Sequence, residues 1–235
     1  MGALAHPHCT PYRDVGHTCT ANQGREVCGV SGPPAGNATA AEIFERRVLP
    51  LYQLADDAGA IAAACHAMAV RFHRGGTLVV FGNGAASTDA QHVAVEFVHP
   101  VIMGKRALPA ISLTADVATV TGIAGLEGFD EIFAHQLRQL ASARDIALGI
   151  SPDGHCGNVV RGLAAARELG MLTIALTGGD GGRIASDHAA DHIVVARSED
   201  PRVIKEVHVT SYHVLWELVH VFFEHPSLLE PGAVA

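Results

Sequence analysis

The sequence predicts an α/β protein in which helices flank a doubly wound, five-stranded parallel sheet. Short apolar runs alternate with helix-compatible stretches between residues 77 and 196, and such alternation is typical of a parallel sheet. The runs are continuously apolar, which indicates strands covered by helices on both faces. The chain has 235 residues, 49% hydrophobic but only 5% aromatic, so we expect a core built mainly from small aliphatic side chains.

Residues 1–38 precede this pattern. They are rich in Gly, Pro, Thr and Asn and have no sustained apolar period, so we expect a flexible N-terminal extension followed by a single domain over 39–235. The spacing of the extension's histidines and cysteines matches no paired Cys-x-x-Cys zinc site. We therefore favour an incidental tail over a metal site, although these side chains can bind metal: His6, His8, Cys9, His17, Cys19 and Cys28.

The elements of the domain follow in order. Residues 39–73 are Ala-rich, with Thr39 as a candidate N-cap and with Pro50 and Gly59 dividing the stretch into about two helices. A helix without interruption is expected over 201–224, where apolar residues recur near helical spacing. Between these helical regions we expect five strands, at 77–81, 109–113, 146–150, 172–176 and 192–196.

Composition and charge exclude several classes of partner. The chain has 16 basic and 24 acidic side chains and a net charge of −8, which argues against binding nucleic acid or an anionic membrane surface. No apolar stretch approaches the roughly 18 to 20 residues that span a bilayer, and the N-terminus does not resemble a secretory signal. Five cysteines are an odd number, so we expect no disulfide framework and a cytoplasmic protein.

Ligands of open parallel sheets bind beyond the carboxyl ends of the strands. Residues 82–89 form a glycine turn that runs directly into a helix, whose free N–H groups attract anions. Residues 151–158 open a second helix at the same edge, so the two loops together predict a pocket. The first loop matches neither the dinucleotide-binding nor the ATP-binding glycine motif, and a simple turn is an equally good interpretation. In a third loop, 177–182, Asp180 is a candidate helix cap.

Two pairs of residues on predicted helices are candidates for catalysis or ligand binding. His92 and Glu96 lie four residues apart, as do His213 and Glu217, so each pair shares one helix face. Lys205 lies eight residues before His213, on roughly the same face. Either pair could serve a metal or a substrate, but for an isolated helical histidine we favour a structural role.

The order of these motifs resembles the sugar isomerase (SIS) fold, a flavodoxin-like three-layer sandwich, and more narrowly the phosphoheptose isomerases. Those enzymes convert sedoheptulose 7-phosphate into a glycero-manno-heptose 7-phosphate. The resemblance covers about residues 39–224. It rests on the Gly-Asn-Gly loop, the helix from Gln91 to Glu96, the ISxxGxxxNV-like loop, Ala-Leu-Thr-Gly-x-Asp-Gly-Gly and Lys-Glu-Val-His-Val-x-x-x-His.

The resemblance implies a homotetramer with active sites between subunits, with Glu96 as catalytic base and His213 as its acid/base partner. Isomerisation through an enediol needs one group to move a proton between adjacent carbons and another to manage the oxygen protons, which suits Glu and His. It also implies zinc bound by His92, Glu96, His213 and a glutamine. The residues that correspond to the ligand-binding positions are Asn83, Gly84, Ala85, Ser151, Asp153, Cys156 and Lys205.

This sequence departs from the family at the metal position and in the sugar-binding region. Lys205 stands where the family has its zinc-binding glutamine, and an ammonium group does not ligate zinc, so at most three ligands remain. An Asn-Asp pair that contacts sugar in the family falls on Gly125 and Leu126.

The loop at residues 151–158, which corresponds to the family's phosphate-binding loop, also departs from the family pattern. Of the family's phosphate-binding serines only Ser151 is retained, and the others correspond to Ala86, Asp153 and Cys156. A carboxylate repels a phosphate by about 1 kcal/mol per charge pair at 4 Å in water. We therefore expect an altered substrate, with Asp153 and Lys205 pairing with each other or binding a polar ligand that lacks phosphate.

These observations support one leading function and two alternatives. The first is an isomerase acting on a sugar or sugar phosphate, favoured because Glu96 and His213 are retained. The second is a non-catalytic SIS protein that senses a sugar derivative or binds a partner protein, favoured by the lost serines. The third is an accessory protein of metalloenzyme assembly that uses the His- and Cys-containing extension.

Overall fold

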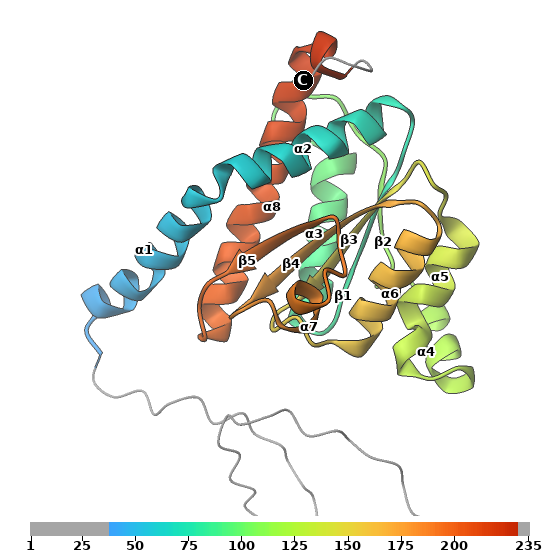
Figure 1. Ribbon diagram of the computed structural model, residues 1–235, viewed down its shortest axis with the longest axis horizontal. Coiled ribbons are helices and arrows are strands. Elements are labelled where there is room, and N and C mark those ends of the chain that lie inside the picture. Colours follow the sequence, from blue (N-terminus) through green and yellow to red (C-terminus); the bar gives the residue numbers. More distant parts are fainter. Residues whose placement is uncertain (1–37, 230–235) are drawn as a thin grey trace, which may run out of the picture. The chain divides into compact units, whose positions relative to one another are not determined.

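The computed structural model of the chain describes residues 38–229 (Figure 1). The extension expected over 1–38 lies, apart from its last residue, outside the described residues. The described residues fall into two units, 38–44 and 45–229. In the described part of the first unit, Thr39 forms a capping box with Glu42: the Thr39 N–H donates to the Glu42 carboxylate at 2.7 Å, and the Glu42 N–H donates to the Thr39 hydroxyl at 3.3 Å. Thr39 thus caps the start of α1 (Ala40–Asp56), as its sequence position predicted.

The second unit contains a five-stranded sheet in which every pair of neighbours is parallel, with the order β2-β1-β3-β4-β5. This confirms the predicted fold class. The strands are β1 (Leu78–Gly82), β2 (Ala110–Ser112), β3 (Ile146–Ser151), β4 (Leu172–Gly178) and β5 (His192–Ala196). In register, Gly82 lies opposite Ile150, and Ser151 lies opposite Thr177. The loops that follow β1, β3 and β4 therefore start side by side at one edge of the sheet.

Helices cover both faces of the sheet, as the continuous hydrophobicity of the strands predicted (Figure 1). The α-helices after α1 are α2 (Ala58–His73), α3 (Ala85–Val98), α4 (Val117–Leu126), α5 (Ile132–Leu140), α6 (Gly157–Glu168), α7 (Gly182–Ser186) and α8 (Pro201–Glu224). Two short 3₁₀ turns lie at Phe129–Glu131 and Pro226–Leu229.

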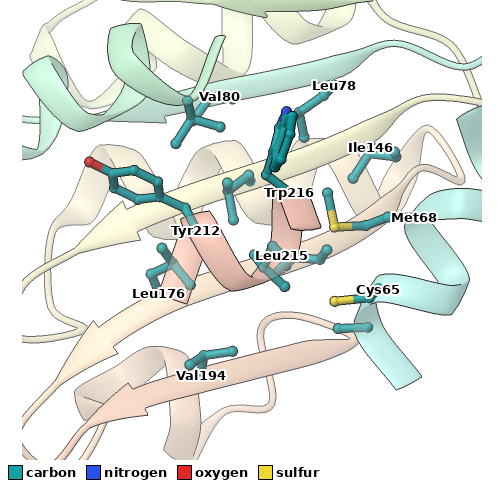
Figure 2. Packing of buried hydrophobic residues seen from close by; sticks show 14 of the residues in the cluster. Cys65, Met68, Leu78, Val80, Ile146, Leu176, Val194, Tyr212, Leu215 and Trp216 are labelled. Carbon is teal, nitrogen blue, oxygen red and sulfur yellow. The ribbon is translucent and has the colours of Figure 1, made fainter. Parts of the chain in front are cut away.

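Alternate residues of β1, β3, β4 and β5 belong to two separate hydrophobic cores. Leu78 and Val80 of β1 join the core formed with α2, α3 and α8, while Val79 and Phe81 join the core formed with α5 and α6. Figure 2 shows the first core, where Trp216 and Leu215 of α8 and Met68 of α2 pack over the strands. Because α3 and α8 lie on the same face, this core also fixes the two helices that carry the site residues.

Two details differ from the sequence-based expectation. The first helix does not end at Pro50 but continues through it to Asp56, because a proline inside a helix removes one backbone donor without necessarily ending the helix. Strand β2 is only three residues long, shorter than the 109–113 expected. It is an edge strand with a single neighbour, so fewer backbone groups hold it in place.

The described cysteines, Cys65 and Cys156, are both free thiols. Burial raises the pKa of the Cys65 thiol to about 12, so it packs as a neutral apolar side chain. Within 38–229, no helix has the length and apolar character needed to cross a membrane.

Candidate active site

The loop after β1 depends on two glycines. A side chain on Gly82 would approach the Ile150 carbonyl oxygen to 2.8 Å and the Ala86 side chain to 2.9 Å. Gly84 caps α3 with a φ of 54°, a conformation that glycine adopts readily. The turn therefore delivers the chain directly into α3, where the Ala86 and Ser87 N–H groups donate to the Asn83 and Gly84 carbonyls at 2.9 and 3.0 Å.

A carboxylate between two imidazoles forms the centre of the site. Glu96 Oε1 lies 3.2 Å from His92 Nε2, on the same helix, and 3.4 Å from His213 Nε2, on α8. The Glu96 side chain is 14% exposed, whereas the two histidine side chains are about half exposed. The ligand atoms of the three residues lie within 4.8 Å of one another. The structure thus brings together the two expected catalytic residues and the expected metal ligands.

The partner of His213 is Glu96 rather than Glu217, the residue one turn along its own helix. Glu217 is exposed, and the described residues show no ion pair between it and His213. The Trp216 indole N–H donates to the Glu96 backbone carbonyl at 3.0 Å. This bond connects α8 to the backbone of Glu96, the residue that carries the central carboxylate.

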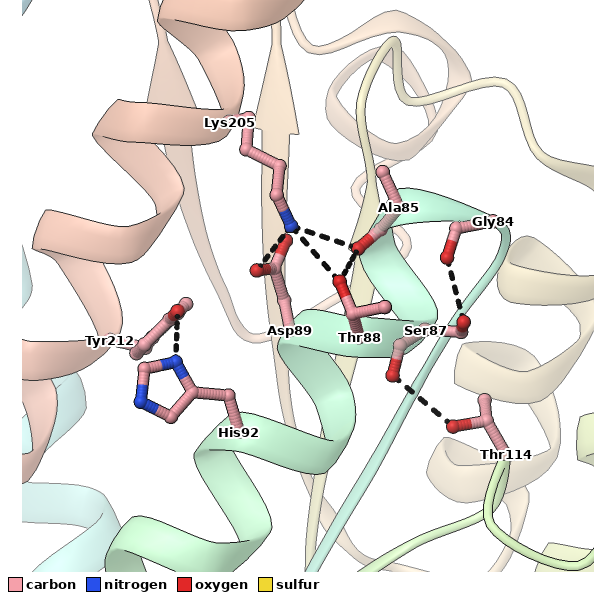
Figure 3. A network of polar contacts seen from close by, with 9 residues as sticks. All are labelled: Gly84, Ala85, Ser87, Thr88, Asp89, His92, Thr114, Lys205 and Tyr212. Atoms are coloured by element: carbon pink, nitrogen blue, oxygen red, sulfur yellow. Dashed lines mark hydrogen bonds and ion pairs between the residues drawn. The ribbon is translucent and has the colours of Figure 1, made fainter.

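Tyr212 contacts the histidines, and no sequence motif had indicated it. Its hydroxyl lies 2.9 Å from His92 Nδ1, the ring nitrogen that faces away from Glu96 (Figure 3). The residue is buried, with 1% exposed. Burial, and then the charges of Asp89 and Glu96, raise the pKa of the Tyr212 hydroxyl, so it remains protonated at neutral pH.

Lys205 pairs with Asp89, not with Asp153 as expected. Its ammonium nitrogen lies 2.6 Å from Asp89 Oδ1, 2.9 Å from the Ala85 carbonyl oxygen and 3.2 Å from the Thr88 hydroxyl (Figure 3). An ammonium has three donors, and all three are used. The Asp89 side chain is 5% exposed, and Coulomb attraction is stronger where water is excluded. Lys205 is therefore held against the first turn of α3.

The Asp153 side chain instead forms hydrogen bonds within its own loop, which follows β3. Its Oδ1 accepts a hydrogen bond from the Ser151 hydroxyl at 3.3 Å and from the His155 N–H at 2.9 Å. The Cys156 N–H donates to the Ser151 oxygen at 3.3 Å. The carboxylate of Asp153 thus uses two donors of its own loop.

The same loop contains Cys156, whose thiol lies 3.9 Å from Asp153 Oδ1. Burial, with a smaller contribution from the Asp153 charge, raises the pKa of the Cys156 thiol. A thiol that stays protonated is a poor nucleophile and a poor metal ligand. Cys156 therefore contributes shape rather than reactivity to this loop.

The three loops at the sheet edge are joined to one another. The side-chain amides of Asn83 and Asn158 exchange two hydrogen bonds, at 2.7 and 3.0 Å, which connect the loop after β1 to the start of α6. The Ile184 N–H donates to the Gly154 carbonyl at 3.1 Å, which connects the loops after β3 and β4. These contacts therefore connect the three predicted pocket loops at the end of the sheet where α3 begins.

Comparison with known proteins shows which family this chain resembles over most of its length. Residues 44–178 match the SIS domain family. The phosphoheptose isomerase of Desulfovibrio desulfuricans is 41% identical over 161 residues, which cover 67% of this chain and 75% of the relative. That of Pelobacter propionicus is 41% identical over 178 residues, covering 76% and 88%.

Two solved structures are similar as well. A phosphoheptose isomerase from Francisella tularensis superposes with a TM-score of 0.72 at 33% identity, covering 77% of this chain and 96% of that one. The phosphoheptose isomerase from Neisseria gonorrhoeae superposes with a TM-score of 0.70 at 30% identity, covering 76% and 95%.

Proposed function

Because the chain belongs to the SIS domain family and is a sugar phosphate isomerase, we propose that Glu96 is the base of its aldose–ketose isomerisation and His213 the acid/base partner. The single observation that carries this proposal is the contact of both histidines with one oxygen of a largely buried carboxylate. A base held in one orientation transfers protons efficiently.

The chemistry assigns a separate task to each group. Glu96 removes a proton from the carbon next to the carbonyl group and returns it to the neighbouring carbon, so that an enediol is the intermediate. His213, 44% exposed in its side chain, is available to donate and accept the protons of the substrate oxygens. Partial burial of Glu96 limits competition from water for its lone pairs.

We propose that the substrate is a phosphorylated ketose of the sedoheptulose 7-phosphate type, because the relatives at about 40% identity are named phosphoheptose isomerases. The three connected loops lie at the carboxyl ends of the strands, where open parallel sheets bind their ligands. This position supports a substrate that extends from Glu96 to the loop after β3. In this proposal the turn over Asn83, Gly84 and Ala85 contacts the sugar, and Ser151 contacts the phosphate end. The carboxylate of Asp153 weakens phosphate binding relative to a serine at this position.

Turnover of defined sugars tests the activity directly. The protein is incubated with a panel of ketose phosphates, aldose phosphates and the corresponding free sugars, and interconversion is followed by NMR. We expect conversion of at least one phosphorylated heptose. Absence of interconversion across the whole panel would contradict the proposed substrate class.

We further propose that His92, Glu96 and His213 hold a zinc ion. Two imidazoles and a carboxylate are ligands that zinc accepts, and their spacing allows one ion to contact all three. Zinc in such a site supplies Lewis acidity that polarises a carbonyl oxygen. Lys205 cannot complete the ligand set, because its ammonium group, which pairs with Asp89, has no lone pair to offer a metal.

Replacement of Lys205 by glutamine is expected to raise zinc affinity at least about tenfold, equivalent to about 1.4 kcal/mol, because an amide oxygen can serve as a fourth ligand. Affinity is measured by competition with a chromogenic chelator. The matched control is Lys105→Gln, which removes the other lysine of the chain, paired with Glu224. Equal zinc affinity of Lys205→Gln and the control would contradict the prediction.

We propose a homotetramer, as the resemblance to phosphoheptose isomerases implies. Helix α1 exposes apolar side chains, including Val48, Leu49 and Tyr52, the last with 68% exposed, and contiguous exposed apolar surface is typical of subunit interfaces. Light scattering coupled to gel filtration should give four times the 24.5 kDa of one chain. A mass of one chain at micromolar concentration would contradict this.

A further inference from the structure

We propose that Tyr212 is a positioning residue that holds the His92 ring against Glu96 and thereby sets the direction of the base. The inference rests on the proposed role of Glu96. It adds to the site a side chain that touches neither the carboxylate nor, in this proposal, the substrate.

The first observation is the pair of bonds on the His92 ring. Nδ1 meets the Tyr212 hydroxyl at 2.9 Å, and Nε2 meets Glu96 Oε1 at 3.2 Å. With a hydrogen-bonding partner on each side, the ring has one preferred orientation. A catalytic group whose partner is itself fixed by a third residue is a recurring arrangement in enzymes.

The second observation is how the rings pack. The Tyr212 ring meets the His92 ring edge-on, with centroids 5.4 Å apart, and the His213 ring edge-on, with centroids 4.9 Å apart. Such T-shaped contacts are favourable for aromatic rings. Since Tyr212 is buried, it is a rigid support for both imidazoles that contact Glu96.

The third observation is the charge behind the hydroxyl. The charge of Asp89 acts on the Tyr212 hydroxyl, and Asp89 is paired with Lys205 at 2.6 Å. Two neighbouring pairs of polar residues therefore connect α3 to α8: Lys205 with Asp89, and Tyr212 with His92. The Lys205–Asp89 ion pair thus holds α8 against α3 beside the contact between Tyr212 and His92.

The test is Tyr212→Phe, which removes the hydroxyl and keeps the buried ring. We expect kcat to fall about 10- to 100-fold, the usual cost of losing an outer partner of a functional histidine, with KM within about twofold of its original value. Thr210→Val, which removes from the same helix a hydroxyl that donates to the Glu206 carbonyl at 3.2 Å, is the control and should leave both constants unchanged. Thermal melting verifies that both variants are folded.

Two further readouts separate positioning from a merely structural role. In ¹⁵N NMR, Tyr212→Phe should shift the His92 Nε2 resonance, the nitrogen that faces Glu96, and not only that of Nδ1. In a double-mutant cycle, Tyr212→Phe should have no further effect on turnover once Glu96 is replaced by glutamine.

Each outcome decides a different point. If Glu96→Gln has no effect on turnover, the proposed role of Glu96 fails, and the positioning role fails with it. If Glu96→Gln impairs turnover while folded Tyr212→Phe retains kcat, or shifts Nδ1 alone, the positioning role is overturned and the proposed function stands.

Discussion

Replacement of Glu96 by glutamine is expected to lower kcat by about 10²- to 10⁴-fold, the range that a general base contributes, while KM changes by less than about threefold. Glutamine has the size of glutamate and keeps an oxygen that can accept from His92 and His213, but it cannot take up a proton. The loss therefore reports base chemistry rather than altered packing. Initial rates of sugar phosphate isomerisation measure it.

Glu217→Gln is the matched control for this experiment. Glu217 lies one helical turn from His213 but is exposed, and its replacement should leave kcat unchanged. This control also separates the two carboxylates that sequence spacing had offered as histidine partners. Equal kcat in wild type and Glu96→Gln would show that the base lies elsewhere.

Replacement of Asp153 by serine is expected to lower KM for phosphorylated substrates about tenfold. The carboxylate accepts from the Ser151 hydroxyl and the His155 N–H, so its removal frees both donors for a phosphate. It also removes a repulsion of about 1 kcal/mol per charge pair at 4 Å in water. Steady-state kinetics with a ketose phosphate measure the change.

The substrate supplies the control for Asp153→Ser. The unphosphorylated ketose lacks the group that the carboxylate repels, so its KM should stay within about twofold. An unchanged KM for the phosphate ester, or equal improvement for both sugars, would show that Asp153 does not face the phosphate end.

Much of the fold follows from the sequence because the strands are continuously apolar. An apolar run such as β3, buried at each of its six positions, is most stable inside a parallel sheet that helices cover on both faces. The order of the loops then fixes which residues meet at the sheet edge. The SIS assignment and the isomerase function, predicted from the order of these motifs, are confirmed by relatives at about 40% identity.

The polar contacts between residues far apart in the sequence were harder to predict. Lys205 was expected to pair with Asp153 or to bind a polar ligand with it, but its partner, Asp89, lies 116 residues away in sequence. The spacing of Asp89, three residues before His92 and seven before Glu96, places it on the same face of α3 and was the signal that could have found it. Tyr212 gave no such signal, because an aromatic residue at a core position is indistinguishable in sequence from packing.

Isomerisation of a ketose phosphate in D₂O tests the central claim most directly. If Glu96 carries the proton between the carbons of an enediol, the carboxyl group exchanges with solvent, and NMR should find deuterium at C2 of the aldose formed by the wild type. Glu96→Gln should form aldose at least about 10²-fold more slowly. Aldose that forms without deuterium at C2, at a rate that Glu96→Gln leaves unchanged, would contradict the account.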